Sequence, residues 1–423
     1  MQTSNERSGT GPSVYIETHG CKLNSADSQS LVRRFSDAGY VIAAAGDAAN
    51  VFVLNTCTVT HVADRKARQA LGRAKRQMPE ALIVATGCMA ERISNDVASL
   101  SSVDMVVTNR DKNHLVDLVS ERVGKTTPCA DGRPLSQSQY LLGRSRSFIK
   151  IQEGCNQVCA YCIVPRVRGR ERSIPEVDLV DQVRHVVGLG CLEVVLTGTQ
   201  LGSYGFDLKS SNLVSMVKRI LAETEVQRLR VSSLQPAEIT TDLIALWTGL
   251  GNGRLCPHFH IPLQSGSNRM LARMRRRYSQ GQYLGAVERI RSMVPDASIT
   301  ADVISGFPGE KDSDHEDTLD VMARVGLADV HVFPYSARPG TSAAHFKEQV
   351  PTPVRIARAA EARALGERAS KKYRKSMIGQ KRSVLWEGTN WESGLTDNYV
   401  KVQRIGLPLN AMPSWGKIET VIL

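Results

Sequence analysis

Short apolar runs alternate with amphipathic stretches along most of the chain, and this alternation predicts parallel α/β structure. In the first part of the chain, apolar or β-branched runs typical of buried strands occur at residues 14–17, 51–55 and 82–85. Helical periodicity separates them at residues 27–38 and 60–77, and Pro79 ends the second of these helices. Strands and helices that alternate in this way predict a doubly wound parallel sheet, which we place in a domain over residues 13–123.

Residues 124–146 break this periodicity with Gly, Pro, Ser, Gln and Thr, so we interpret them as a linker. Further strands are then predicted at residues 148–152, 192–197, 229–232, 258–261, 298–304 and 330–333. Helical patterns separate them at residues 177–187, 213–222, 238–247, 282–293 and 314–325. Six β/α units over residues 147–370 predict an incomplete version of the eight-unit barrel, with function at the carboxyl ends of its strands.

The last part of the chain has a different pattern. A basic helix is predicted at residues 354–373, and short strands follow at 384–387, 399–403 and 417–422 among Gly, Asn and Pro turns. This pattern predicts a small β-barrel over residues 376–423, a type of fold that often binds nucleic acid. The expected fold class is therefore α/β, with an N-terminal doubly wound sheet, a central incomplete (βα)6 barrel and a C-terminal β-barrel.

Composition narrows the class of protein. The chain has 423 residues and a net charge of +12, from 54 Lys and Arg against 42 Asp and Glu. It has no apolar run of about 18 residues, so we expect no membrane span. Residues 1–12 contain no apolar segment, so we expect no secretory signal. Nine cysteines in such a chain indicate a reducing cytoplasm and thiols that bind metal or act in catalysis.

The positive charge is concentrated in four runs. They comprise Arg65, Lys66, Arg68, Arg73, Lys75 and Arg76; Arg166, Arg168, Arg170 and Arg172; Arg273, Arg275, Arg276 and Arg277; and Lys371, Lys372, Arg374 and Lys375. Any one run is compatible with a solvated helix face. Four runs in separate regions favour a nucleic acid partner, either RNA or DNA.

Three cysteines, Cys155, Cys159 and Cys162, directly follow the first predicted barrel strand, on a loop that begins at Gly154. A structural zinc site would need a fourth ligand at similar spacing, and none follows nearby. Three thiolates on a cubane iron–sulfur cluster leave one iron free to bind a substrate or cofactor. The spacing therefore favours an open iron–sulfur cluster over zinc.

A second trio is dispersed: Cys21, Cys57 and Cys88 each come just after a predicted strand of the N-terminal sheet. The carboxyl ends of such strands border the crevice where parallel sheets bind ligands. Helix N-termini also favour a thiolate and an anionic cluster. The alternative is that these three cysteines are simply small buried residues. We interpret the remaining cysteines, Cys129, Cys191 and Cys256, as core or incidental residues.

Glycines and polar residues mark the ends of other barrel strands. Gly198 and Gly306 follow the second and fifth strands, where glycine lets backbone amides approach a ligand closely. Gln264 follows the fourth strand, in which His258 and His260 share one face. With no third ligand in register, we interpret these two histidines as lumen or core residues.

Taken together, these motifs resemble the methylthiotransferase family of radical S-adenosylmethionine (SAM) enzymes. The resemblance runs from about residue 13 to the end and rests on residues 18–24, 55–57, 87–88, 154–156, 161–165, 168–169, 260–267, 306–310 and 335–341. The C-terminal part resembles the RNA-binding barrel called the TRAM domain.

The resemblance implies two 4Fe–4S clusters. Cys155, Cys159 and Cys162 would hold the one whose open iron is chelated by SAM, and reductive cleavage of SAM would give a 5′-deoxyadenosyl radical. Cys21, Cys57 and Cys88 would hold the second, which would present sulfur to the substrate. The resemblance further implies that Tyr161 packs on the adenine of SAM, and that Gly198, Gln264 and Gly306 line the cofactor pocket. An external electron donor of the flavodoxin or ferredoxin type is expected.

Within the family, residues 148–155, 231–236 and 394–402 best resemble the branch that acts on threonylcarbamoyladenosine beside the tRNA anticodon. The isopentenyladenosine branch comes second, and the branch that modifies an aspartate of a ribosomal protein comes third. A hypothesis from another class is a non-catalytic zinc protein that binds RNA through its basic surfaces.

Overall fold

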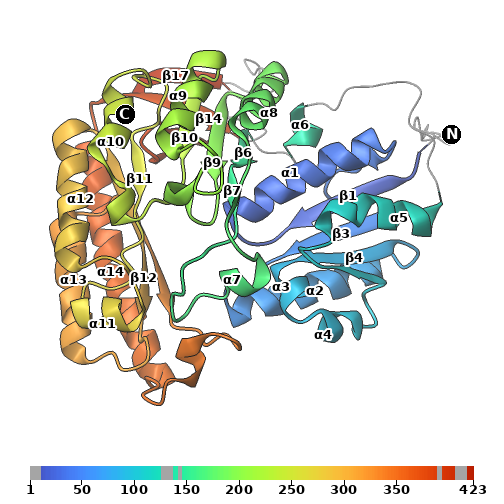
Figure 1. Cartoon of the computed structure of the whole chain (residues 1–423), viewed down its shortest axis with the longest axis horizontal. Coiled ribbons are helices and arrows are strands. Elements are labelled where there is room, and N and C mark those ends of the chain that lie inside the picture. The colour runs from blue at the N-terminus through green and yellow to red at the C-terminus, as the bar shows by residue number, and fades with distance from the viewer. Residues whose placement is uncertain (1–10, 125–136, 142–144, 388–392, 405–416) are drawn as a thin grey trace. The chain divides into compact units, whose positions relative to one another are not determined.

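The computed structural model describes residues 11–124, 137–141, 145–387, 393–404 and 417–423 (Figure 1). Contacts divide the chain into two units, Met1–Gly143 and Arg144–Leu423, and each is described by itself below. Among the helices of these described residues, none has the length and apolar character needed to cross a bilayer.

A five-stranded parallel sheet with the strand order β2-β1-β3-β4-β5 forms the centre of the first unit. The three predicted strands are present as β1 (Ser13–Thr18), β3 (Val51–Thr56) and β4 (Leu82–Gly87). Two short edge strands, β2 (Val41–Ile42) and β5 (Met105–Val107), were not predicted, because two or three residues are too few to show an alternating pattern. The strand order reverses between β1 and β3, and such a switch point opens a crevice at the carboxyl ends of the strands.

Helices cover both faces of this sheet, as the doubly wound prediction requires. On one face, α1 (Lys22–Asp37) and α5 (Leu115–Val123) bury apolar residues against β1 and β3, and on the other, α2 (His61–Gln77) packs against β3 and β4. The remaining helices are α3 (Cys88–Arg92), α4 (Ser94–Ala98) and, inside the predicted linker, α6 (Gln137–Tyr140).

Helix α1 begins earlier than its apolar periodicity indicates. Its first turns bury the polar residues Asn24, Ser25 and Asp27 together with apolar ones, and these polar positions interrupt the hydrophobic pattern. Helix α2 begins where predicted, because the side chain of Thr60 accepts a hydrogen bond from Ala63 N and caps the helix.

The second unit contains all six strands of the predicted barrel, each parallel to its neighbours. They form two sheets, β10-β9-β6 and β11-β12-β13, with isolated bridges Leu229↔Leu255 and Ser233↔His260 between them. Their bounds are β6 (Arg146–Lys150), β9 (Glu193–Thr197), β10 (Arg228–Val231), β11 (His258–His260), β12 (Ser298–Ser305) and β13 (Asp329–Pro334). The α/β class with parallel sheets is therefore confirmed.

Most helices of this unit follow the sequence pattern: α8 (Glu176–Gly188), α9 (Leu213–Glu223), α10 (Thr241–Thr248), α12 (Gln280–Met293), α13 (Asp312–Val325) and α14 (Thr352–Ser376). The shorter helices α7 (Val164–Val167) and α11 (Asn268–Arg273) were not predicted. The predicted start of α10 at residue 238 is wrong. Pro236–Glu238 forms a separate 3-10 turn, and Thr240 caps α10 by accepting a hydrogen bond from Leu243 N.

Four antiparallel strands end the chain, in the order β16-β15-β14-β17. They are β14 (Lys381–Glu387), β15 (Ser393–Thr396), β16 (Lys401–Gln403) and β17 (Lys417–Ile422). Strand β15 was not predicted: it contains Gly394, which leaves room for the ring of Trp386 and weakens the strand pattern.

Buried arginines of β10 fix this C-terminal sheet to the parallel strands. Arg228 donates to the carbonyls of Leu395 and Thr396 at 3.1 and 3.0 Å, and Arg230 donates to the carbonyl of Asp397 at 3.0 Å. The C-terminal strands therefore belong to the same unit as the parallel strands.

Candidate active site

The loop that carries Cys155, Cys159 and Cys162 follows a short strand, β7 (Gln152–Glu153), which pairs with β8 (Arg172–Ser173). The loop can start there only because of Gly154, whose φ is +78° and where a Cβ would lie 2.0 Å from the carbonyl oxygen of Arg170. The amide of Cys155 donates to the carbonyl of Gly169 at 3.1 Å, which closes the loop against the segment before β8.

The three thiols of this loop lie in a poorly solvated environment. Cys155 is buried, and Cys159 and Cys162 are half-buried. Burial, with smaller contributions from the nearby thiols of Cys159 and Cys155, raises the pKa of Cys162 to about 12. Thiolates are therefore disfavoured here unless a bound cation compensates them, which is what a metal centre does.

These thiols suit a centre with several metal atoms. Among the described residues, no group of three or more His, Cys, Asp or Glu side chains is arranged to hold one metal ion. Three sulfur donors on one loop match the ligand chemistry of an iron–sulfur cluster. The donor set therefore fits the cluster that the sequence predicts.

The predicted cofactor residues lie at the carboxyl ends of the strands around this loop. Tyr161 and Phe307 meet edge to face with ring centroids 6.4 Å apart, which brings the cysteine loop next to Gly306. A Cβ on Gly198 would lie 3.0 Å from the carbonyl oxygen of Gln152. Gln264 is buried and has a φ of +60°, an unusual conformation for a residue other than glycine that is often found at functional sites.

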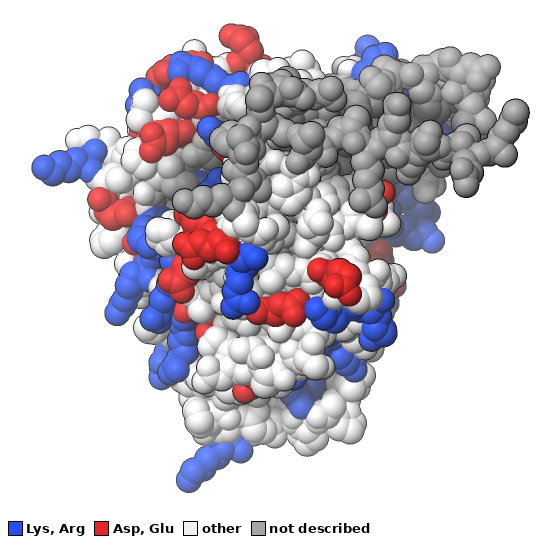
Figure 2. Space-filling model, turned by 90° about the vertical axis from the view of Figure 1, so that its right-hand side faces the viewer, with Lys and Arg blue, Asp and Glu red and all other residues white. Residues whose placement is uncertain are grey.

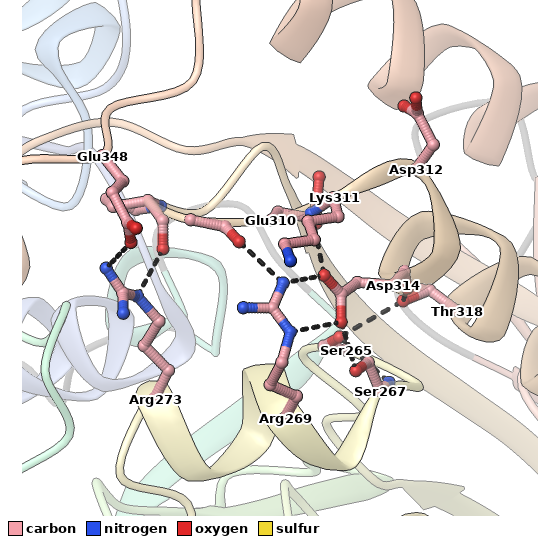
Figure 3. Close-up of polar contacts among 12 residues, drawn as sticks. Ser265, Ser267, Arg269, Arg273, Glu310, Lys311, Asp312, Asp314, Thr318 and Glu348 are labelled. Atoms are coloured by element: carbon pink, nitrogen blue, oxygen red, sulfur yellow. Dashed lines mark hydrogen bonds and ion pairs between the residues drawn. The ribbon is translucent and has the colours of Figure 1, made fainter.

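The segment that contains Gly306 is held by ion pairs on both sides (Figure 3). Two side chains from α11 and its N-terminus contact the carboxylate of Asp314. The hydroxyl of Ser267 donates to it at 2.6 Å, and Arg269 donates to it as well. Arg273 donates to the carbonyl of Pro308 at 2.8 Å and pairs with Glu348. Arg273, a member of one of the four basic runs, is thus engaged within the fold.

Buried hydroxyl groups at the same strand ends were not predicted. The hydroxyl oxygens of Thr199, Ser232, Ser305 and Tyr335 are buried and have no hydrogen-bond partner within the described chain. They stand at or just beyond the carboxyl ends of β9, β10, β12 and β13. Because buried polar atoms are nearly always paired, this face is suited to a polar ligand such as SAM. Single Ser and Thr residues at strand ends carry no motif that sequence reasoning could have used.

The second trio of cysteines lies at the switch point of the first unit. Cys21 is the N-cap of α1, Cys57 follows β3, and Cys88 is the first residue of α3. A Cβ on Gly20 would lie 2.7 Å from the Cβ of Cys57, so the first loop is in contact with the second. Burial, with smaller contributions from the nearby thiols of Cys21 and Cys88, raises the pKa of Cys57 to about 12.

Asparagine side chains hold these loops together. Asn24 donates to the carbonyls of His19 and Thr56 at 2.7 and 3.0 Å, and Asn55 donates to the carbonyl of Asn24 at 2.9 Å. Gly87 allows β4 to end beside β3, because a Cβ there would lie 2.5 Å from the carbonyl oxygen of Thr56. The structure thus places the three dispersed cysteines on neighbouring loops of the first unit.

Comparisons with known proteins match two family models to this chain, one in each of its two units. Residues 13–108 match the model of the Uncharacterized protein family UPF0004, and residues 149–322 match that of the Radical SAM superfamily. The chain is 36% identical to Threonylcarbamoyladenosine tRNA methylthiotransferase MtaB of Aquifex aeolicus, over 93% of this chain and 97% of the relative. It is 33% identical to the Bacillus subtilis protein of that name, over 92% and 89%. It is also 34% identical to tRNA-2-methylthio-N(6)-dimethylallyladenosine synthase of Syntrophus aciditrophicus, over 92% and 87%.

The chain belongs to the radical SAM methylthiotransferase family. Among solved structures, it resembles the radical SAM methyltransferase TsrM of Kitasatospora setae, with a TM-score of 0.56 at 14% identity over 76% of this chain and 73% of that one. This likeness supports the fold. Family membership makes the protein an enzyme that uses SAM and an iron–sulfur cluster, so the hypothesis of a non-catalytic zinc protein is wrong.

In this methylthiotransferase, a chain of amide groups links β7 to the segments that follow β9 and β10. The side-chain oxygen of Gln152 accepts hydrogen bonds from the amides of Thr199 and Gln200, each at 3.0 Å. Gln235 donates to Gln200 at 2.5 Å, and Gln200 donates to the carboxyl group of Glu238. Burial raises the pKa of Glu238 to about 7. Sequence reasoning missed this network because its members become neighbours only when the strands align.

The basic runs of the methylthiotransferase have different environments. On α2, Arg65, Lys66, Arg68 and Arg76 are exposed and form no ion pair within the described residues, whereas Arg73 pairs with Glu17. Figure 2 shows Lys and Arg side chains mixed with Asp and Glu on the face it presents, with basic groups crowded along its left edge.

Two other runs differ from each other in exposure. Arg168 is buried and pairs with Glu153 at 2.6 Å, so it supports the cysteine loop, whereas Arg166, Arg170 and Arg172 are exposed. In the run at the end of α14, Lys371, Lys372, Arg374 and Lys375 are all exposed.

The remaining singled-out residues are mostly internal, as expected. Cys191 and Cys256 are buried, and Cys129 lies outside the described residues. His258 and His260 are buried and contact the hydroxyl group of Thr300 at 2.9 and 3.0 Å. Their predicted role in the lumen or core is therefore supported.

Proposed function

We propose that this methylthiotransferase transfers a methylthio group to C2 of threonylcarbamoyladenosine beside the anticodon of tRNA. The observation that carries the proposal is the similarity, over more than nine-tenths of the chain, to relatives whose names state this activity. Six thiols in two separate groups support it, because an enzyme that both generates a radical and delivers sulfur needs two centres.

We assign one 4Fe–4S cluster to Cys155, Cys159 and Cys162 and a second to Cys21, Cys57 and Cys88. When bound, the first cluster and SAM supply the radical that removes hydrogen from a C–H bond too weakly acidic for any base of the chain. Gly154 and Arg168 hold the cysteine loop in place, and Glu153 fixes Arg168.

We assign the SAM pocket to Tyr161, Gly198, Gln264 and Gly306, together with the buried hydroxyls at the strand ends. The aromatic ring of Tyr161 provides a face for an adenine, and the hydroxyls provide partners for the ribose and amino acid parts of SAM. Tyr161 packs against the apolar cluster that contains Phe307, which would form this side of the pocket.

We propose three functional domains for the chain: a cluster-binding domain at residues 13–123, a radical SAM core at 147–370 after a linker at 124–146, and a TRAM-like domain at 376–423. In this proposal the core is an incomplete barrel, and the antiparallel strands close into a small barrel that binds tRNA. The exposed cations of α2 and α14 would contact phosphates. The enzyme would act in the cytoplasm with a flavodoxin- or ferredoxin-type electron donor.

Nucleoside analysis tests the proposed substrate. In tRNA from a strain that lacks the protein, threonylcarbamoyladenosine should be present and its methylthio form absent. Wild-type protein and a Cys191→Ala variant should restore the methylthio form, because Cys191 is a buried thiol outside both sites, whereas Cys155→Ala should not. An unchanged nucleoside profile in the deletion strain would contradict the proposal.

Isopentenyladenosine is the second candidate substrate, because relatives of the dimethylallyladenosine synthase type are equally similar, at 34% identity. The same extracts decide between the two. Loss of methylthio-isopentenyladenosine, with methylthio-threonylcarbamoyladenosine retained, would assign the enzyme to this second branch.

A further inference from the structure

One arginine of a basic run points into the active site instead of toward solvent. Arg275 and Arg277 are exposed, but Arg276 between them is half-buried. Its Nη1 atom lies 3.3 Å from the sulfur of Cys159, and its guanidinium carbon lies 4.9 Å from the centroid of the Tyr278 ring. Its Nε atom is buried and has no hydrogen-bond partner within the described chain.

The backbone explains why only this arginine turns inward. Helix α11 ends with a hydrogen bond from Met274 N to Met270 O, and Arg275 then adopts a φ of +59°, which reverses the direction of the chain. The same turn is tied to the cysteine loop, because Ala160 N donates to Met274 O at 3.0 Å. Arg276 and Cys159 are therefore held together by the fold.

We propose that Arg276 is a positioning residue that favours reduction of the cluster held by Cys155, Cys159 and Cys162. The inference rests on the cluster assignment in the proposed function. In the step concerned, one electron from the external flavodoxin- or ferredoxin-type donor enters the cluster, and no covalent bond forms or breaks. The cluster gains one negative charge, and the donor loses one electron.

A fixed positive charge beside a ligand sulfur stabilises the more negative, reduced state more than the oxidised state. Arginine suits this task because its guanidinium group cannot be deprotonated in a protein. Contact with the ring of Tyr278 holds the group in place, and burial keeps its charge from being screened by salt.

The test is a redox titration of the full chain in which Cys21, Cys57 and Cys88 are replaced by Ala, so that only one cluster contributes. Electron paramagnetic resonance measures the reduced cluster at a series of fixed potentials, without SAM. Arg276→Gln is compared with Arg276→Lys and with Arg277→Gln, a control that removes the same charge from an exposed position of the same run. Iron and sulfide per chain establish that each variant holds its cluster.

In Arg276→Gln, the ratio of reduced to oxidised cluster at a fixed potential should fall about ten-fold, a shift of the midpoint by 59 mV to lower potential. Arg276→Lys, which retains the charge without the planar fork, should lie between this variant and wild type. Arg277→Gln should titrate like wild type. If Arg276→Gln does not retain its cluster, Arg276→Lys is compared with wild type instead. A lower midpoint supports the inference, and an equal midpoint overturns it.

Equal midpoints for Arg276→Gln and Arg277→Gln would overturn the inference. Weakened SAM binding with an unchanged midpoint would also overturn it and would assign Arg276 to SAM. A parent protein without iron would instead overturn the cluster assignment itself, so the two failures are distinguishable.

Discussion

Glu193 is the residue on which the attachment of the C-terminal sheet depends, and Glu193→Gln tests this directly. Its side chain is fully buried, and its carboxylate lies 2.9 Å from Arg230 and 2.7 Å from Arg228. Burial alone would raise the pKa of Glu193, but the guanidinium groups of Arg230 and Arg228 lower it to about 2.

The expected loss of stability can be worked out in two ways. Arg228 and Arg230 are 2% and 0% exposed, and breaking a buried pair by removing one partner costs about 3–5 kcal/mol. Independently, a fall of the carboxyl pKa from 4.5 to about 2 corresponds to about 3 kcal/mol of stabilisation. Because the folded pKa is the lower one, this stabilisation is complete above pH 4.5 and is lost as the pH falls toward 2.

Urea unfolding followed by tryptophan fluorescence measures this loss. All four tryptophans lie between residues 144 and 423, so the fluorescence reports the second unit alone. Glu223→Gln is the control, because Glu223 is exposed and pairs with Arg219 on the surface, and it should unfold like wild type. A Glu193→Gln protein within about 1 kcal/mol of wild type at pH 7 would refute the reasoning, as would a difference that does not shrink below pH 4.5.

Three further changes have defined outcomes. Gly154→Ala should lose the iron bound by the second unit, because its Cβ would lie 2.0 Å from a backbone oxygen. Gly188→Ala should keep this iron, because a Cβ there meets no atom within 4 Å. Iron analysis of proteins that lack Cys21, Cys57 and Cys88 measures the difference. Burial raises the pKa of Glu238 to about 7, so wild type should lose stability relative to Glu238→Gln as the pH rises from 5 to 8. Thermal unfolding measures this, and a stability difference between the two proteins that does not change with pH would contradict it. Thr60→Ala should destabilise the first unit by about 1 kcal/mol in hydrogen exchange of α2, since it removes the N-cap; unchanged protection would show that the cap contributes nothing.

Most of the fold could be predicted from periodicity, and the errors have physical causes. The strands that precede Cys21, Cys57 and Cys88 are rich in apolar and β-branched residues and are followed by helical patterns, so β1, β3 and β4 stand out. Strand β15 was missed because Gly394 replaces a side chain that would have marked the pattern.

The candidate site could be predicted only where it has compact motifs. The cysteine loop and the glycines at strand ends have recognisable spacing, but the hydroxyls of Thr199, Ser232 and Ser305 become a group only when separate strands align. Charge runs were the least informative feature. In one run of arginines, Arg273 holds the loop before α13, Arg276 contacts Cys159, and Arg277 is exposed. These different positions depend on the turn at the end of α11, which the charge pattern does not reveal.

The most direct test of a two-cluster radical methylthiotransferase is the iron and acid-labile sulfide content of anaerobically reconstituted protein. Wild type should hold about eight iron atoms per chain, and replacing either Cys155, Cys159 and Cys162 or Cys21, Cys57 and Cys88 by Ala should leave about four. Replacing the buried Cys191 and Cys256 by Ala should leave the iron content unchanged. About four iron atoms in wild type, or zinc without sulfide, would contradict the account.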